Sequence, residues 1–267
     1  MVRFMERLRR GITLTVDSIH VLREYPRLTL FPLVSAVVGV AFLGLFSSVM
    51  LGTMVVRPEG GVLVVLFVVY LALTFVSTFF TAGLVHQTRH ALEGGTPSLV
   101  AGVTAAWRAK SRLVVWAMIA STVGVLINGV ENSNARGGRI FGALFGFAWT
   151  LMTFFIVPVI VFEETGVGGM FSRSLETFKQ TWGETPVSMV GVQLISVVVG
   201  LPLFLIGLML FSAQPLVGVG VILVGVVFTF LVVQTLEGII KTTLYLYATE
   251  GKRPSEFDDV DFEALAS

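Results

Sequence analysis

Six long apolar stretches dominate the pattern of hydrophobic and polar positions along the chain. Each is long enough for a helix, which rises about 1.5 Å per residue, to cross roughly 30 Å of hydrocarbon. Because the stretches are continuously apolar rather than alternating with a period of two, they favour helices over the strands of a membrane barrel. The predicted spans are residues 28–56, 61–85, 113–130, 140–162, 187–211 and 216–236.

The connections between these spans alternate between short and long. Residues 57–60, 131–139 and 212–215 are short turns, so each joins two neighbouring spans as a hairpin. The segments before the hairpins are longer, and they are amphipathic: residues 5–22, for example, place apolar side chains at steps of three and four. Helices of this kind lie in the headgroup plane. The sequence therefore predicts an all-α fold of six transmembrane helices, arranged as three helical hairpins that each follow an in-plane amphipathic helix.

The distribution of positive charge predicts the orientation of the spans. Of the 18 lysines and arginines, 15 lie in the long connections and at the two ends of the chain, while only Arg57, Arg136 and Arg139 lie in the short turns. Positively charged residues near the ends of spans stay on the cytoplasmic side. We therefore expect a multi-pass protein of the plasma membrane with both termini in the cytoplasm.

The composition of the chain excludes several classes of protein and of site. With 55% hydrophobic and 13% charged residues, the chain lacks the polar surface that a water-soluble protein of this length needs. A net charge of +1 creates no field that would attract nucleic acid, and the absence of cysteine excludes disulfides and thiolate metal sites. The sequence has no phosphate-binding glycine loop and no hydrolase motif. We expect membrane lipids as partners, no nucleic acid, no cofactor, and no catalytic or metal-binding residues.

Self-comparison indicates an internal repeat. A shift of 85 residues places Arg23 and Arg27 on Arg108 and Arg112, and a shift of 157 residues superposes the Glu-Gly-x-x-Pro-Ser segments at 93–98 and 250–255. Repeats of about 1–92, 93–163 and 164–250 would form a single membrane domain over residues 1–255; chance matching in a chain rich in valine and glycine is the alternative. The repeat predicts that spans two and six continue as helices to about residues 92 and 249, where glycine stops them.

Several short segments resemble a known family. They are Leu-Arg-Glu-Tyr-Pro at 22–26 leading into Leu-Phe-Pro-Leu at 30–33, Phe-Phe-Ile-Val-Pro-Val at 154–159, and Arg-Ser at 173–174 with Thr-Trp-Gly at 181–183. Together they are similar to the domain of unknown function 6159, a group of prokaryotic membrane proteins with six helices. The resemblance extends over nearly the whole chain and implies the same topology. It implies no activity and no functional residues, because none is established for the family.

Neutral polar side chains form a modest track within the spans. The candidate track is Tyr70, Thr74, Ser77, Thr78 and Thr81 in the second span, with Gln193 and Gln234 in the fifth and sixth. These residues could line a polar path. Serine and threonine in lipid usually bond to their own helix or to a neighbour, however, so packing is the favoured interpretation.

Charged and small residues supply the other candidates. Glu237 and Lys241, four residues apart near the inner end of the sixth span, predict a structural ion pair, with a role in conduction as the alternative. His86 and His90 have a spacing that could hold a metal, but a solvated helix explains them equally well. A small-residue ridge at the start of the fourth span would let a helix of this chain or of another subunit approach closely. Its members are Gly138, Gly142 and Gly146.

Two functions remain open at this point. The glycine ridge, the amphipathic helices and the uncharged span interiors favour a non-catalytic scaffold, assembly or accessory component, with a second copy or another membrane protein as its partner. The alternative is an oligomeric channel or transporter for a small solute or ion that uses the polar track. An enzyme is disfavoured. The acidic tail at 256–267 is either a flexible cytoplasmic end or a docking segment.

Overall fold

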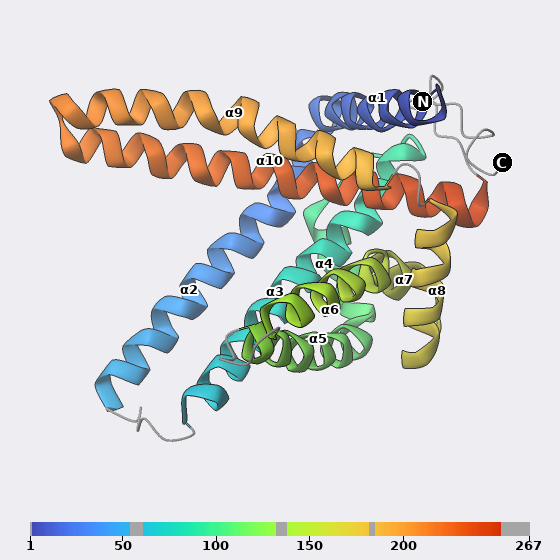
Figure 1. The fold of residues 1–267 in the computed structure, drawn as a ribbon, viewed down its shortest axis with the longest axis horizontal. Coiled ribbons are helices and arrows are strands. Elements are labelled where there is room, and N and C mark those ends of the chain that lie inside the picture. Colours follow the sequence, from blue (N-terminus) through green and yellow to red (C-terminus); the bar gives the residue numbers. More distant parts are fainter. Residues whose placement is uncertain (1, 54–60, 132–137, 182–184, 252–267) are drawn as a thin grey trace. The chain divides into compact units, whose positions relative to one another are not determined.

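The computed structural model describes residues 2–53, 61–131, 138–181 and 185–251. Every regular element in this part of the chain is helical, which confirms the predicted all-α fold (Figure 1). The elements are, in order, α1 (Val2–Glu24), the short 3-10 helix η1 (Pro26–Thr29), α2 (Leu30–Thr53), α3 (Gly61–Leu92), α4 (Leu99–Arg108), α5 (Lys110–Glu131), α6 (Gly138–Thr153), α7 (Ile156–Phe162), α8 (Val167–Gln180), α9 (Thr185–Ala213) and α10 (Pro215–Glu250).

Six helical segments are long and apolar enough to cross a membrane. They are Pro26–Met50, Val64–Leu92, Lys110–Val130, Ile140–Phe162, Met189–Ala213 and Pro215–Glu250. The protein is therefore a multi-pass membrane protein, as the hydropathy pattern predicts. Helices α1, α4 and α8 precede the three pairs of spans, so the order of elements also follows the prediction.

The helix stops predicted from the repeated Glu-Gly motif are present. Helix α3 ends at Leu92, and Gly94 adopts a positive φ of 81°. The Gly94 N–H donates to the carbonyl of Ala91 at 2.9 Å, and the Gly95 N–H donates to that of His90 at 2.9 Å. This is the Schellman arrangement that satisfies the last carbonyls of a helix. Helix α10 ends at Glu250, where Gly251 has a φ of 61°.

The chain divides into two compact units. One comprises Met1–Leu30, Gln87–Pro97 and Lys179–Ser267, and the other comprises Phe31–His86 and Ser98–Phe178. We call them the α9–α10 unit and the α5–α6 unit, after the helical hairpin that each contains. Helices α3 and α8 each continue from one unit into the other.

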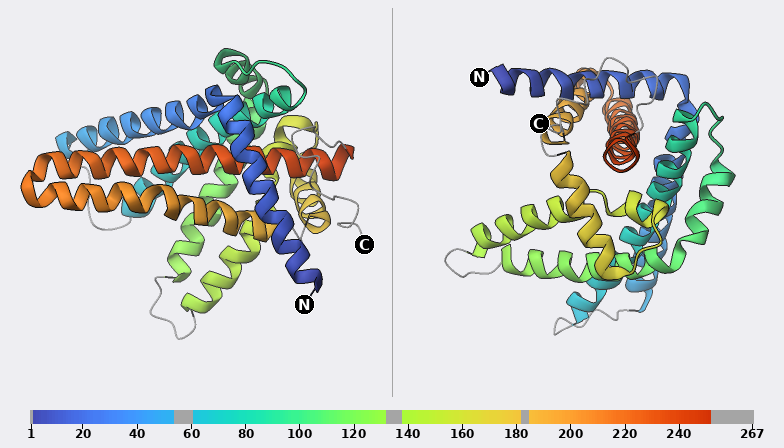
Figure 2. Two further views of the ribbon diagram at one scale, coloured as in Figure 1. Left: turned by 90° about the horizontal axis from the view of Figure 1, so that it is seen from above. Right: turned by 90° about the vertical axis from the view of Figure 1, so that its right-hand side faces the viewer.

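In the α9–α10 unit, two long antiparallel helices pack along their length and α1 packs on both (Figure 2). In the halves of the two helices nearest the turn that joins them, the backbones approach closely at glycines. A Cβ at Gly207 would overlap Ile222, and a Cβ at Gly218 would overlap Phe211. Toward the other end, the core includes Leu14, Val21 and Leu28 from the N-terminal segment, together with Leu236, Ile239 and Leu244 of α10. This end is also rich in buried hydroxyls, so the two ends of the hairpin differ in chemistry.

In the α5–α6 unit, α5 and α6 form a second antiparallel hairpin (Figure 2). Helix α4 lies against α3, where a Cβ at Gly83 would stand 2.8 Å from the Phe31 ring and 3.2 Å from the carbonyl carbon of Gly102. The core of this unit includes Phe31, Leu113, Phe155 and Ile160, each at most 1% exposed.

Candidate functional site

A cluster of charged side chains joins helices α5, α7 and α8 within the α5–α6 unit. The Arg112 guanidinium donates to the backbone carbonyl oxygen of Glu163, which follows α7. The Glu163 carboxylate accepts from Arg173 Nε, at 3.2 Å and 3.0 Å to its two oxygens. Arg173 Nη1 also donates to Glu176 Oε2 at 3.0 Å. We call these four residues the arginine–glutamate cluster.

Arg173 keeps its positive charge at any ordinary pH. Hydrogen bonding to Glu163, and secondarily to Glu176, raises the pKa of Arg173 above its usual value, because both bonds favour the charged guanidinium. A group with a raised pKa contributes its stability below that pKa and loses it only as the pH rises through it. For Arg173 that point lies in strong alkali. Arg173 is therefore a permanent cation at the centre of the cluster.

Three aromatic rings pack beside this joint. The indoles of Trp116 on α5 and Trp149 on α6 are stacked, with centroids 5.8 Å apart and planes 10° apart. The Phe171 ring of α8 contacts both, at 6.0 Å and 5.8 Å. Such pairs add about 0.5–1.5 kcal/mol beyond the area that they bury. The triad ties α8 to the α5–α6 hairpin.

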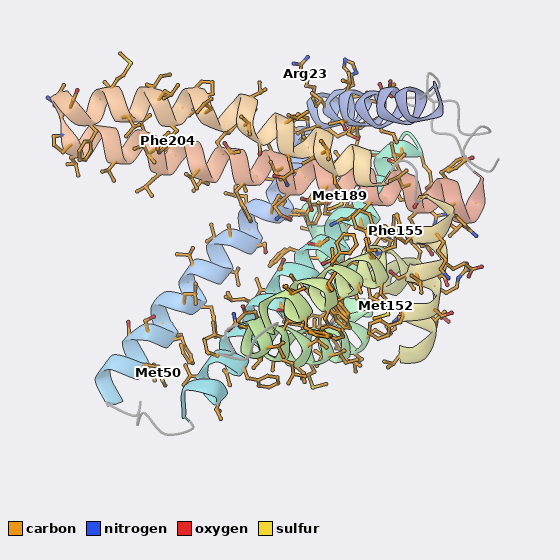
Figure 3. All side chains as sticks on the ribbon, in the orientation of Figure 1. Arg23, Met50, Met152, Phe155, Met189 and Phe204 are labelled. Atoms are coloured by element: carbon orange, nitrogen blue, oxygen red, sulfur yellow. The ribbon has the colours of Figure 1, made fainter. Side chains whose placement is uncertain are left out.

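The sixteen-residue helix α6 and the short α7 are separated by a break that α8 repairs. Pro158 lies in α7 and has no N–H to continue the helical ladder. At the break, the N–H of Phe155 (labelled in Figure 3) donates to Ser174 Oγ at 3.1 Å. Both residues are fully buried. A hydroxyl from α8 therefore satisfies a backbone donor that the fourth span leaves open.

A second charged joint lies in the α9–α10 unit. Arg89, near the end of α3, pairs with Glu93 at 3.1 Å and with Glu250, the last residue of α10, at 3.0 Å. Glu93 and Glu250 are the two acidic residues of the repeated Glu-Gly-x-x-Pro-Ser motif. One arginine therefore holds both copies of the motif together.

One hydroxyl of the predicted polar track, that of Thr78, bonds to its own helix. Thr78 Oγ1 donates to the carbonyl of Thr74 at 2.7 Å. The Tyr70 ring packs against Gly124, whose Cβ position lies 3.5 Å from it, while Ser77 is exposed and Thr81 half-buried. These members belong to the α5–α6 unit, whereas exposed Gln193 and half-buried Gln234 belong to the α9–α10 unit.

The predicted charged pair is a salt bridge: Lys241 Nζ lies 3.2 Å from Glu237 Oε2, with the two side chains 26% and 24% exposed.

His90 packs against Gly95, while His86 is half-buried on α3. Within the part of the chain that the structure describes, no three histidine, aspartate or glutamate side chains gather as metal ligands would. The acidic tail at 256–267 lies outside the described residues.

The glycine ridge of the fourth span faces the same chain. Gly138 and Gly142 are buried, and the Cβ position of Gly146 lies 3.7 Å from Ile127 of α5. That distance is an ordinary contact, so the ridge does not require glycine at Gly146. Tighter glycine contacts, which the sequence analysis above does not single out, lie between α9 and α10. A signal was present, because Gly200 and Gly207, like Gly218 and Gly225, are seven residues apart.

An apolar groove of about 260 Å³ lies between α9 and α10. Its lining is Gly200, Phe204, Ile222, Gly225, Val226 and Thr229. Phe204 of α9 is 46% exposed (Figure 3), and the Thr229 hydroxyl already donates to the carbonyl of Gly225 at 2.8 Å. The groove therefore offers packing surface but no group suited to acid–base or nucleophilic chemistry.

Fold and site together define a multi-pass α-helical membrane protein whose charged residues join helix ends. The family model described as a family of unknown function, DUF6159, matches residues 60–255, nearly three quarters of the chain. The protein belongs to this family. The match begins just before α3, so the Leu-Arg-Glu-Tyr-Pro segment at 22–26 lies outside it. Neither the curated proteins nor the solved structures include a significant match.

Proposed function

We propose that this protein is a non-catalytic scaffold or accessory component of the plasma membrane, with both termini in the cytoplasm. It would act through its contacts with lipid and with other membrane proteins, including further copies of itself. Membrane lipids are its surroundings in this proposal, and nucleic acid has no part in it.

The observation that carries the proposal is the chemistry of the span interiors. Residues 28–53, 61–85, 113–130, 140–162, 185–213 and 215–236 contain no Asp, Glu, Lys, Arg or His. Ionisable groups at membrane depth are the usual mark of proton relays, ion coupling and substrate binding. Their absence from these six stretches disfavours coupled transport and catalysis in the interior of the bilayer.

The charged groups nearest the spans support the same proposal. Arg89 pairs with Glu93 and Glu250, Arg173 with Glu163 and Glu176, and Lys241 with Glu237. Paired charges at helix ends fix the geometry of a helical assembly. Such joints suit a protein whose task is to hold surfaces in place.

Reconstitution tests this proposal against the channel alternative. Purified protein in liposomes should release trapped ions and small solutes no faster than protein-free liposomes, because the six stretches above contain no charged side chain that could line a path. Flux above that background that the variant Thr78→Val reduced would overturn the scaffold proposal in favour of a path along the polar track.

The oligomeric state tests the part of the proposal that concerns contacts with other membrane proteins. In mild detergent, light scattering should give a protein mass well above the 28.9 kDa of one chain, either as a homo-oligomer or with a stoichiometric membrane-protein partner. A monomeric six-span protein of similar size, purified in the same detergent, provides the reference. A preparation from native membranes that is monomeric at every detergent concentration would contradict the proposal.

A further inference from the structure

Helix α4 presents two contrasting faces. Its buried face contains Gly102 and Ala106 and packs where α3 carries Gly83, whose Cβ position lies 3.2 Å from the Gly102 carbonyl carbon. Its open face carries Val100, which is 76% exposed, and Trp107, which is 59% exposed. Between them, the Thr104 hydroxyl is satisfied by the Val100 carbonyl at 2.8 Å. The close contact at Gly83 fixes the helix, so an apolar strip faces outward.

The strip ends at two exposed cations. The Trp107 indole packs edge-on against Phe79, with centroids 6.4 Å apart, so its position is set by α3. Lys110 Nζ lies 4.4 Å from the centre of the Trp107 ring, which is within cation–π range. Arg108, the last residue of α4, is exposed. One cation therefore stands over the indole, and a second exposed cation is its neighbour in the chain.

These two cations have no competing acid nearby in the chain. Residues 94–130 contain no Asp or Glu, and among the described residues neither Arg108 nor Lys110 has a carboxylate partner. Arg112, one turn further on, is already committed to the Glu163 carbonyl. The positive charge of Arg108 and Lys110 is thus available to an external anion.

We propose that the corner between α4 and α5, formed by Val100, Trp107, Arg108 and Lys110, binds the phosphate of an anionic phospholipid headgroup. Arg108 and Lys110 would contact the phosphate, while Trp107 and Val100 enter the region where headgroups meet acyl chains. Indoles favour that interface, and basic residues beside it are attracted to anionic lipid. A soluble phosphate would use the cations but leave the apolar strip in water, so the combination selects lipid.

Native mass spectrometry of the full-length protein in detergent tests the inference, with phosphatidylglycerol and phosphatidylcholine as probes. The double variant Arg108→Gln/Lys110→Gln should lose affinity for phosphatidylglycerol by about 30-fold, since each cation near an anionic leaflet contributes a factor of about 5. Its affinity for phosphatidylcholine should change little. The charge-preserving variant Arg108→Lys/Lys110→Arg should bind nearly as the unmodified protein does.

Arg23→Gln/Arg27→Gln is the matched control, because these two arginines are also exposed, lie just before another span and carry the same total charge (Arg23 in Figure 3). An equal loss in this control would overturn the specific site. So would equal binding of the two lipids by the unmodified protein, or full displacement of phosphatidylglycerol by millimolar inorganic phosphate. The last two measurements need no variant, so they decide the matter even if the double variant fails to fold. The inference does not depend on the scaffold proposal, because lipid binding is measured separately from flux and assembly.

Discussion

Arg89 and Glu250 lie 161 residues apart in the chain, yet their side chains meet at 3.0 Å. Arg89 stands one turn before the end of α3, and Glu250 is the last residue of α10. Because Arg89 also holds Glu93, the two copies of the Glu-Gly-x-x-Pro-Ser motif share one cation. The ends of the two long helices α3 and α10 are thus fixed together within the α9–α10 unit.

A double-mutant cycle between Arg89→Gln and Glu250→Gln should give a coupling free energy of about 1 kcal/mol. This lies at the upper end for partly exposed pairs, because each side chain is less than a third exposed. Thermal or denaturant unfolding in detergent measures it. Glu93→Gln is the control: its pair with Arg89 lies within one helix and is more exposed, so its coupling should be about 0.3–0.5 kcal/mol. Equal coupling energies would show that the contact between helices adds nothing.

The close contacts between α9 and α10 predict different outcomes at two glycines of one helix. Gly218→Ala should destabilise the protein by about 1–3 kcal/mol, because the new methyl group would overlap the backbone of Phe211. Gly220→Ala is the matched control, with nothing within 4 Å of its Cβ position. It should be neutral or stabilise by up to about 1 kcal/mol through helix propensity. Unfolding curves of the two variants, recorded in one detergent, check both signs; similar effects would contradict the packing described here.

The helix ends and the spans are the features of this fold that the sequence alone predicts. The positive φ angles of Gly94 and Gly251 follow from local pattern, because glycine after an apolar helix and before proline stops a helix regardless of its surroundings. The six spans are predictable for a similar reason, since lipid requires every span to be apolar and internally hydrogen-bonded. Both features depend on neighbours within a few residues.

The joints between helices could not be predicted in the same way. Arg89 has acidic residues available at several positions, and its choice of Glu250 depends on how α3 and α10 come together. Likewise, Ser174 gives no sign in the sequence that its hydroxyl meets the backbone of Phe155. Several arrangements of paired polar groups fit one hydropathy pattern. The spacing of seven between glycines in α9 and α10 is visible in the sequence, but it is less typical of a helix-packing motif than the spacing of four at residues 138–146.

Two fully buried serines provide a test of the break between α6 and α7. Ser174→Ala should cost about 1–3 kcal/mol, because it removes the acceptor of the buried Phe155 N–H. Ser121→Ala removes a hydroxyl that only adds a second bond to the Ala117 carbonyl of its own helix, at 2.6 Å, so it should cost less than about 1 kcal/mol. Unfolding free energies would separate the two variants. If Ser121→Ala were the more damaging, the role assigned to Ser174 would be wrong.

The Thr78 hydroxyl allows the polar track to be tested without altering the shape of the helix. It donates at 2.7 Å to the Thr74 carbonyl, so its polarity is already satisfied within α3. Thr78→Val keeps the branched side chain and should change the unfolding free energy by less than about 1 kcal/mol, leaving liposome flux at background. Ser48→Ala, which removes an exposed hydroxyl bonded to its own helix on α2, controls for loss of such a bond. If the track conducted water or ions, the Thr78 hydroxyl would instead have to turn toward that water or those ions. In that case Thr78→Val, but not Ser48→Ala, would reduce a measurable flux.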